Sequence, residues 1–82
     1  MKRSKQEIIA QILEVCQESA SKTRIVYQAN LNFRTINPYL DILMKNNLIE
    51  ICKGEQTLYK TTKNGEDLLE TIKKINESLS ND

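Results

Sequence analysis

Apolar residues follow helical spacing along most of this sequence, but one stretch, LIEICKGEQTLYKTT, departs from it. β-Branched and aromatic residues stand on both sides of a turn centred on Gly54, a pattern typical of two antiparallel strands. We expect Ile51 to pair near Leu58, and Ile49 near Lys60. The sequence therefore predicts a β-hairpin within a helical chain, and a fold class that is mainly α with a small β-hairpin (α+β).

Two helical segments stand near the start of the chain. In KQEIIAQILEVCQES the apolar residues recur at helical spacing, with Ser4 as the expected N-cap three residues before Glu7. In TRIVYQAN we expect Thr23 to cap a helix of about two turns, and Asn30 to end it in the left-handed conformation. A short extended piece near residues 20–22 separates the two helices.

The third helical segment has two faces of opposite character. One face is apolar and is expected to pack on the core, at spacings of three, four and three: Phe33, Ile36, Leu40 and Leu43. The opposite face is expected to point outward, and it holds Arg34, Asn37, Asp41 and Lys45, with Thr35 and Pro38 at its margin. The pair Asn46-Asn47 stands where a glycine usually ends a helix, and asparagine also permits a left-handed cap.

Pro38 leaves open where this third helix begins. If Asn32 is the N-cap, Pro38 falls in the second turn, where it removes a hydrogen bond to the carbonyl of Arg34 and costs roughly 3 kcal/mol unless the helix kinks. If Thr35 is the N-cap, Pro38 is the third helical residue, whose N–H would be unpaired anyway. We favour a kinked or late-starting helix. In either case residues 32–37 present polar side chains at a positive helix end.

The segment NGEDLLETIKKINESL predicts a last helix, with Thr61 or Thr62 as N-cap and with Glu66 and Asp67 in the first turn. Its apolar residues repeat at four, three and four positions, which is the seam of a short coiled coil. This seam could pack on the first helix of the same chain or pair with a second chain. We favour a homodimer, formed through Leu68, Leu69, Ile72, Ile75 and Leu79.

Composition argues against several classes of protein. The chain has no histidine, and its cysteines, Cys16 and Cys52, are far apart, so we expect no metal and no other cofactor. There is no paired-carboxylate motif, phosphate loop or nucleophile elbow, so we expect no enzyme and no small-molecule substrate. No apolar run approaches the roughly 20 residues that cross a bilayer, so we expect no membrane association and a cytoplasmic protein.

Charge is unevenly distributed along the 82 residues, although the net charge is only +1. Between residues 22 and 63 there are seven basic and three acidic side chains, whereas residues 64–82 carry a net charge of −3. The middle of the chain is therefore basic and its C-terminal end acidic.

The order helix, extended piece, helix, tight turn, helix, hairpin and long helix is that of a winged helix-turn-helix. TRIVYQANLNFRTINPYLDILMKNNLIE and YKTTKNGEDLL resemble archaeal, or archaeal-virus, winged helix-turn-helix DNA-binding proteins that dimerise through a C-terminal helix. Asn46-Asn47 departs from the Lys/Glu-Gly usual in that family, and the last helix is shorter than its longest examples. The matching pieces are Thr23-Arg24-Ile25, Ala29-Asn30-Leu31, Tyr39-Leu40 with Leu43, Leu48-Ile49, and Tyr59 to Gly65.

The resemblance implies a dimeric, nucleoid-associated protein that binds double-stranded DNA as a transcriptional regulator or chromatin component. Residues 1–64 would form the DNA-binding domain, and residues 65–82 a continuous dimerisation helix. The implied base contacts are Arg34, Asn37, Thr35 and Asn32, and the implied phosphate contacts are Lys22, Arg24, Lys45, Lys53, Lys60 and Lys63. The alternative is a winged-helix module for protein–protein interaction, which should expose apolar anchors on its third helix.

Overall fold

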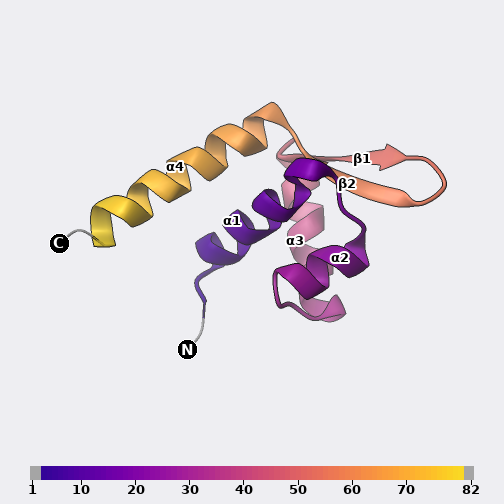
Figure 1. Cartoon of the computed structure of the whole chain (residues 1–82), viewed down its shortest axis with the longest axis horizontal. Coiled ribbons are helices and arrows are strands. Elements are labelled where there is room, and N and C mark those ends of the chain that lie inside the picture. The colour runs from indigo at the N-terminus through magenta and orange to yellow at the C-terminus, as the bar shows by residue number, and fades with distance from the viewer. Residues whose placement is uncertain (1–2, 81–82) are drawn as a thin grey trace.

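The computed structural model describes residues 3–80, of which residues 79 and 80 are described by their backbone alone. Helices and one hairpin follow one another in the expected order (Figure 1). This arrangement confirms the predicted fold class. The elements are α1 (Lys5–Val15), a 3-10 turn η1 (Cys16–Glu18), α2 (Lys22–Gln28), α3 (Phe33–Lys45), β1 (Ile49–Lys53), β2 (Thr57–Thr61) and α4 (Lys63–Ser80).

The first two helices begin at serine caps. The Ser4 hydroxyl accepts a hydrogen bond from the backbone N–H of Glu7 at 3.1 Å, as predicted. The prediction that Thr23 caps α2 is wrong, because Ser21 holds that position and accepts from the N–H of Arg24 at 3.2 Å. Its neighbour Ala20 is fixed in an extended bridge to β2, and the helix therefore starts immediately after Ser21.

The third helix continues through the proline without interruption. Asn32 caps α3, with its side-chain oxygen accepting from the N–H of Thr35 at 2.8 Å, so the late start at Thr35 is wrong. Pro38 lies inside the helix and removes the donor that would reach the carbonyl of Arg34. Both Pro38 and Arg34 are exposed, so water can reach the carbonyl that lacks its helical partner.

The hairpin forms where expected, but its register differs by one residue. Ile51 pairs with Tyr59 and Ile49 with Thr61, instead of with Leu58 and Lys60. The predicted register would close the turn over residues 54–55 alone, whereas the loop between the strands covers residues 54–56. The longer loop therefore moves every partner on β2 by one position.

One core holds these elements together. The apolar stripe of α3 is buried at Ile36, Leu40 and Leu43, as predicted, but Phe33 is 51% exposed and the prediction for it is wrong. Phe33 is the first residue of α3 and lies at the edge of the packed region. The other buried residues of the core cluster come from all the remaining elements: Ile12, Leu13, Cys16, Ala20, Ile25, Val26, Ile49, Tyr59 and Leu69.

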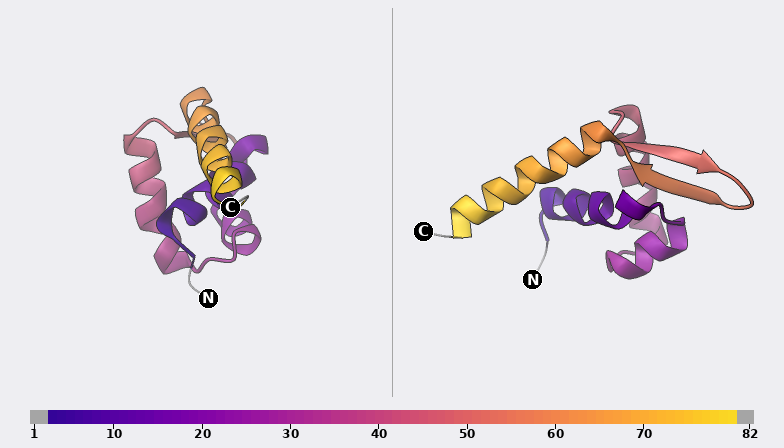
Figure 2. Two further views of the ribbon diagram at one scale, coloured as in Figure 1. Left: turned by 90° about the vertical axis from the view of Figure 1, so that its left-hand side faces the viewer. Right: turned by 45° about the horizontal axis from the view of Figure 1, so that its top comes forward.

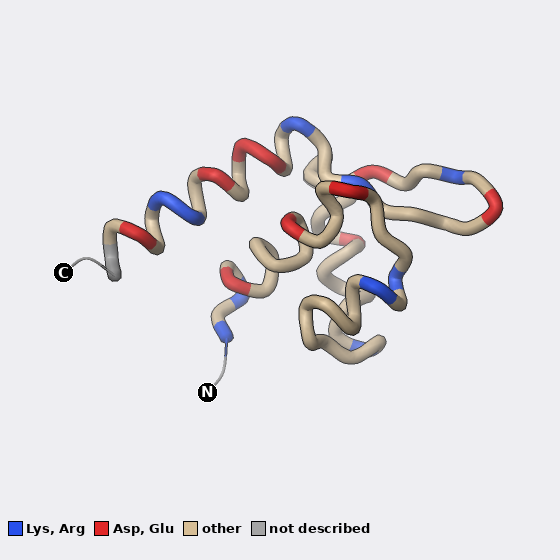
Figure 3. Tube along the Cα trace, viewed as in Figure 1, with Lys and Arg blue, Asp and Glu red and all other residues tan. Residues whose placement is uncertain are grey.

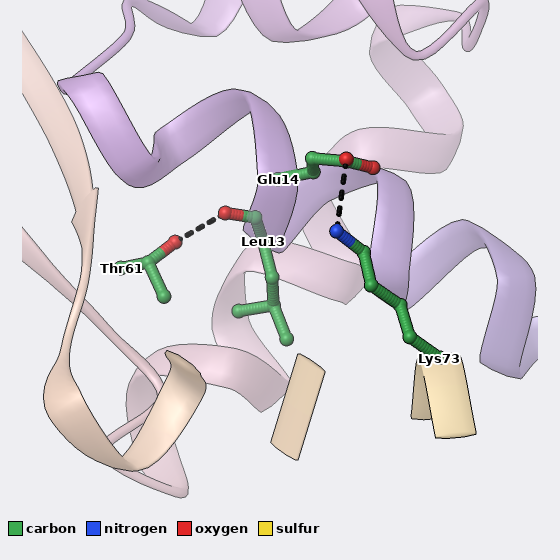
Figure 4. A network of polar contacts seen from close by, with 4 residues as sticks. All are labelled: Leu13, Glu14, Thr61 and Lys73. Carbon is green, nitrogen blue, oxygen red and sulfur yellow. Dashed lines mark hydrogen bonds and ion pairs between the residues drawn. The ribbon is translucent and has the colours of Figure 1, made fainter. Parts of the chain in front are cut away.

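The last helix lies antiparallel to α1 and extends past its N-terminus (Figures 1 and 2). Thr62 caps α4 by accepting from the N–H of Gly65 at 3.1 Å. The buried Thr61 hydroxyl donates to the carbonyl of Leu13 at 2.6 Å, and Lys73 forms an ion pair with Glu14 at 3.2 Å (Figure 4). The Thr61 hydrogen bond therefore ties the end of β2 to α1, and the Lys73 ion pair ties α4 to α1.

Candidate nucleic-acid interface

The outward face of α3 is polar along its whole length. Its four predicted members, Arg34, Asn37, Asp41 and Lys45, are exposed, while Thr35 at its margin is half-buried. Asn32 is exposed too, although its side-chain oxygen is used as the helix cap. Because the opposite face of α3 is fixed in the core, this polar face is held rigidly at the surface.

A hydrogen bond joins this face to the start of α2. The ammonium group of Lys22 donates to the side-chain oxygen of Asn37 at 2.8 Å. Lys22 is half-buried, and Arg24, two residues further along α2, is exposed. The fold thus brings a predicted phosphate contact and a predicted base contact together, which the sequence did not reveal.

The remaining predicted cations come from the hairpin and from the start of α4. Lys53 is exposed at the end of β1, and Lys63 is exposed at the first residue of α4. Lys60 reaches away from the hairpin and donates to the carbonyl of Gln17 in η1 at 3.3 Å. Basic and acidic positions alternate along the hairpin, and cations stand at the start of α2 (Figure 3).

The two helices α2 and α3 meet in a tight turn, and the hairpin follows α3 directly. A family model described as winged helix-turn-helix matches residues 2–80. The chain belongs to this winged helix-turn-helix family. In the terms of the family, α2 and α3 are the helix-turn-helix and β1–β2 is the wing.

Relatives of this winged helix-turn-helix chain include two uncharacterized proteins of the archaeon Methanocaldococcus jannaschii. One is 34% identical over 80 residues, which cover 96% of this chain and 79% of the relative. The other is 40% identical over 76 residues, and the match spans 92% of this chain but only 35% of that longer protein. The predicted likeness to archaeal winged-helix proteins is therefore confirmed.

Among solved structures, the winged helix is similar to Sso10a-2, a DNA-binding protein from Sulfolobus solfataricus. The TM-score is 0.89 at 29% identity, and the match covers 96% of this chain and 84% of the other. BpsR of Bordetella bronchiseptica has a TM-score of 0.77 at 17% identity, over 98% of this chain and 59% of that one, and it supports the fold alone.

Sequence reasoning missed a residue that holds the turn of the helix-turn-helix. The guanidinium of Arg3, which precedes α1, donates to the backbone carbonyls of Ala29 and Asn30 and to the side chain of Gln11. Asn30 has a φ of 54°, so it ends α2 in the left-handed conformation, as predicted. The carbonyls at the end of a helix need partners, but nothing in the spacing of residues identified Arg3 as that partner.

One flank of α3 is apolar. Ile42 is 52% exposed, and with Pro38, Tyr39 and Lys5 it lines a shallow hollow between α3 and the start of α1. Tyr27, near the end of α2, is 78% exposed. The polar face of α3 therefore has the exposed side chains of Pro38 and Ile42 on one flank.

Both cysteines of the winged helix have free thiols. Burial raises the pKa of the Cys16 thiol to about 12, while Cys52 is half-buried in the wing. Across the described residues, no group of three or more Cys, Asp and Glu side chains could hold a metal ion. Within the same part of the chain, no helix is both long and apolar enough to cross a membrane.

Proposed function

We propose that this chain binds double-stranded DNA, with α3 in the major groove and the wing on the phosphate backbone. The observation that carries the proposal is the exposed polar face of α3, with Lys22 beside it. Major-groove recognition by a helix-turn-helix uses such a face on the second helix. The similarity to Sso10a-2, which is a DNA-binding protein, supports the same function.

Each predicted contact has a chemical role in this proposal. Arg34 offers paired donors that suit the O6 and N7 acceptors of guanine, and Asn37 carries an amide, the group that suits adenine. Asn32 and Thr35 stand at the start of α3 as further candidates. The surrounding lysine and arginine side chains would neutralise DNA phosphates. Support is strongest for Lys45 in α3 and for Lys22 and Arg24 in the adjoining α2, and weaker for Lys53, Lys60 and Lys63.

We propose further that two chains associate through α4. This helix has 18 residues against 11 in α1, so it is about 10 Å longer, and it extends past the N-terminus of α1 (Figure 1). Ile75 is 42% exposed and Leu68 is half-buried, whereas Leu69 and Ile72 are each 2% exposed within the single chain. A second chain would therefore mainly meet Ile75 and Leu68. The side chain of Leu79, the last residue of the predicted seam, lies outside the described residues.

A dimeric protein of this kind would act as a transcriptional regulator or as a chromatin-associated protein. Two recognition helices joined through α4 would address two half-sites at a spacing set by the dimer. Both roles need only DNA as partner, in the cytoplasm beside the nucleoid, and neither requires catalysis.

The test is fluorescence anisotropy of a labelled duplex of about 30 base pairs, titrated at several salt concentrations. Arg34→Ala should weaken binding about tenfold, because a bidentate base contact contributes roughly 1–3 kcal/mol. Its melting temperature should not change, since Arg34 is exposed and its side chain forms no hydrogen bond or ion pair with the rest of residues 3–80. Lys74→Ala, which removes an equal charge from exposed α4, is the matched control.

Equal affinities of Arg34→Ala and Lys74→Ala would remove α3 from the interface. A salt dependence that loses about one unit of slope in Lys22→Ala or Arg24→Ala would identify those residues as phosphate contacts.

A protein-interaction module is the second candidate, and one observation favours it. Ile42 and Phe33 are both about half exposed on α3, which is where such a module would carry apolar anchors. They lie on the flanks of α3 and not on its polar face, so DNA binding stays the first proposal. A folded protein that binds no duplex even at low salt would make the interaction module the better account.

A further inference from the structure

The polar face of α3 has a carboxylate in its middle. Asp41 is exposed, four residues after Asn37 and four before Lys45, so the three side chains lie on one stripe of the helix. A surface that only neutralised phosphates would gain from a neutral or basic side chain at this position. Asp41 instead weakens the attraction of this face for any DNA.

Nothing else in the described structure uses this carboxylate. Lys45 follows at the spacing that favours an ion pair within a helix, yet the ion pair found among residues 3–80 is Lys73 with Glu14. No hydrogen bond to the Asp41 side chain is present among those residues either. Both carboxylate oxygens are therefore free to accept hydrogen bonds from a partner.

The side-chain oxygen of the neighbouring Asn37 already accepts a hydrogen bond within the chain. Because Lys22 donates to its side-chain oxygen at 2.8 Å, the amide offers its N–H groups outward. Arg34 also offers only donors. Asp41 is thus the one side chain of the outward stripe of α3 that presents acceptors alone.

Acceptors on a protein select donors on a base. In the major groove the exposed donors are the exocyclic amino groups of cytosine N4 and adenine N6, and a carboxylate pairs characteristically with cytosine N4. Arg34, which suits guanine, lies seven positions earlier on α3, about 10 Å along the helix axis. That distance corresponds to about three base-pair steps of roughly 3.4 Å each.

We propose that Asp41 reads the N4 amino group of a cytosine in the major groove and makes DNA binding by this chain sequence-selective. The proposal rests on the proposed function, since it requires α3 in the groove. It assigns opposite effects to one side chain: Asp41 lowers affinity for DNA in general and raises affinity for duplexes that place a cytosine at its position.

The experiment is selection of bound duplexes from a library with a randomised central segment, followed by anisotropy on the selected and on scrambled duplexes. Wild type, Asp41→Ala and Asp41→Asn are compared. Asp67→Ala is the matched control, because Asp67 is an exposed aspartate on α4 and its loss changes the net charge equally.

We expect wild type to select cytosine at one position about three base pairs from a selected guanine. Asp41→Ala should lose that preference, by about tenfold, while its affinity for scrambled duplexes rises above that of wild type. Asp41→Asn should shift the preference toward adenine, which pairs with an asparagine amide. Asp67→Ala should keep the wild-type preference.

The proposal is overturned if Asp41→Ala selects the same sequences as wild type and binds all duplexes more tightly, since Asp41 would then act only as a charge. Selection of adenine by wild type would also overturn the assignment to cytosine. Failure of wild type to bind any duplex at low salt would be a different result, because it would remove the proposed DNA-binding function itself.

Discussion

Gly65 is the third residue of α4, and a methyl group added there would collide with the chain's own backbone. A Cβ on Gly65 would lie 2.1 Å from the carbonyl oxygen of Leu48 and 2.7 Å from Cγ2 of Thr61, distances that real Cβ atoms essentially never show. The Leu48 carbonyl cannot easily turn aside, because it accepts a hydrogen bond from the N–H of Thr62 at 3.0 Å. Gly65→Ala must therefore separate α4 from the entry of the wing.

The magnitude follows from two opposing effects. Overpacking a closely packed site costs about 1–3 kcal/mol, and a collision with backbone places Gly65→Ala at the upper end of that range. Replacing glycine by alanine within a helix returns about 1 kcal/mol at most. The net loss in the free energy of unfolding is about 2 kcal/mol. For a chain of this size, that loss lowers the melting temperature by roughly 8–16 °C.

Thermal and urea unfolding, followed by circular dichroism, would measure this loss. Gly54→Ala in the wing loop is the matched control, because no heavy atom lies within 4 Å of its added Cβ and its φ is not positive. The free energy of unfolding of that variant should stay within about 0.5 kcal/mol of the wild-type value. A Gly65→Ala protein as stable as wild type, or a Gly54→Ala protein equally destabilised, would refute the reasoning.

Three further outcomes are expected. Ile75→Glu should convert the dimer to monomer in sedimentation equilibrium, whereas Glu77→Lys, on another side of α4, should not; a wild-type monomer would contradict the proposed association. Thr61→Val should cost about 1 kcal/mol in urea unfolding, because it removes the buried hydrogen bond to the Leu13 carbonyl, and unchanged stability would mean that this bond contributes nothing net. The Cys16 thiol has its pKa raised from 9.0 to about 12, so it stays protonated in the folded chain after it ionises in the unfolded one. Stability should therefore fall as pH rises from about 9 to about 12, and Cys16→Ala should lose less stability over that range in unfolding titrations.

Local signals in the sequence predicted the elements well. Ser4 caps α1, and Asn30 and Asn47 adopt φ values of 54° and 59° where the helices α2 and α3 end. The exposed stripe of α3 also follows from helical spacing alone. These features depend on residues a few positions apart, whose geometry is set by backbone preferences and short side chains.

Errors arose where two local choices had similar merit. The sequence predicted Thr23 as the cap of α2, but the bridge between Ala20 and Tyr59, on another part of the chain, places Ser21 there. The hairpin register depended on one residue of loop length. The start of α3 depended on whether Asn32 could cap a helix that contains a proline, and it does.

The sequence by itself determined the order of helices and wing and the residues that face outward from α3, because periodicity and turn residues act over short distances, and the resemblance of its motifs indicated the family. Only the tertiary structure decided which of those residues act together. Lys22 meets Asn37 across two helices, and Arg3 reaches the carbonyls of Ala29 and Asn30 from before α1. The ammonium group of Lys60 donates to the carbonyl of Gln17 in η1. Such contacts depend on how the helices pack around their shared core. Local backbone preferences do not specify the distance between residues that are far apart in the sequence.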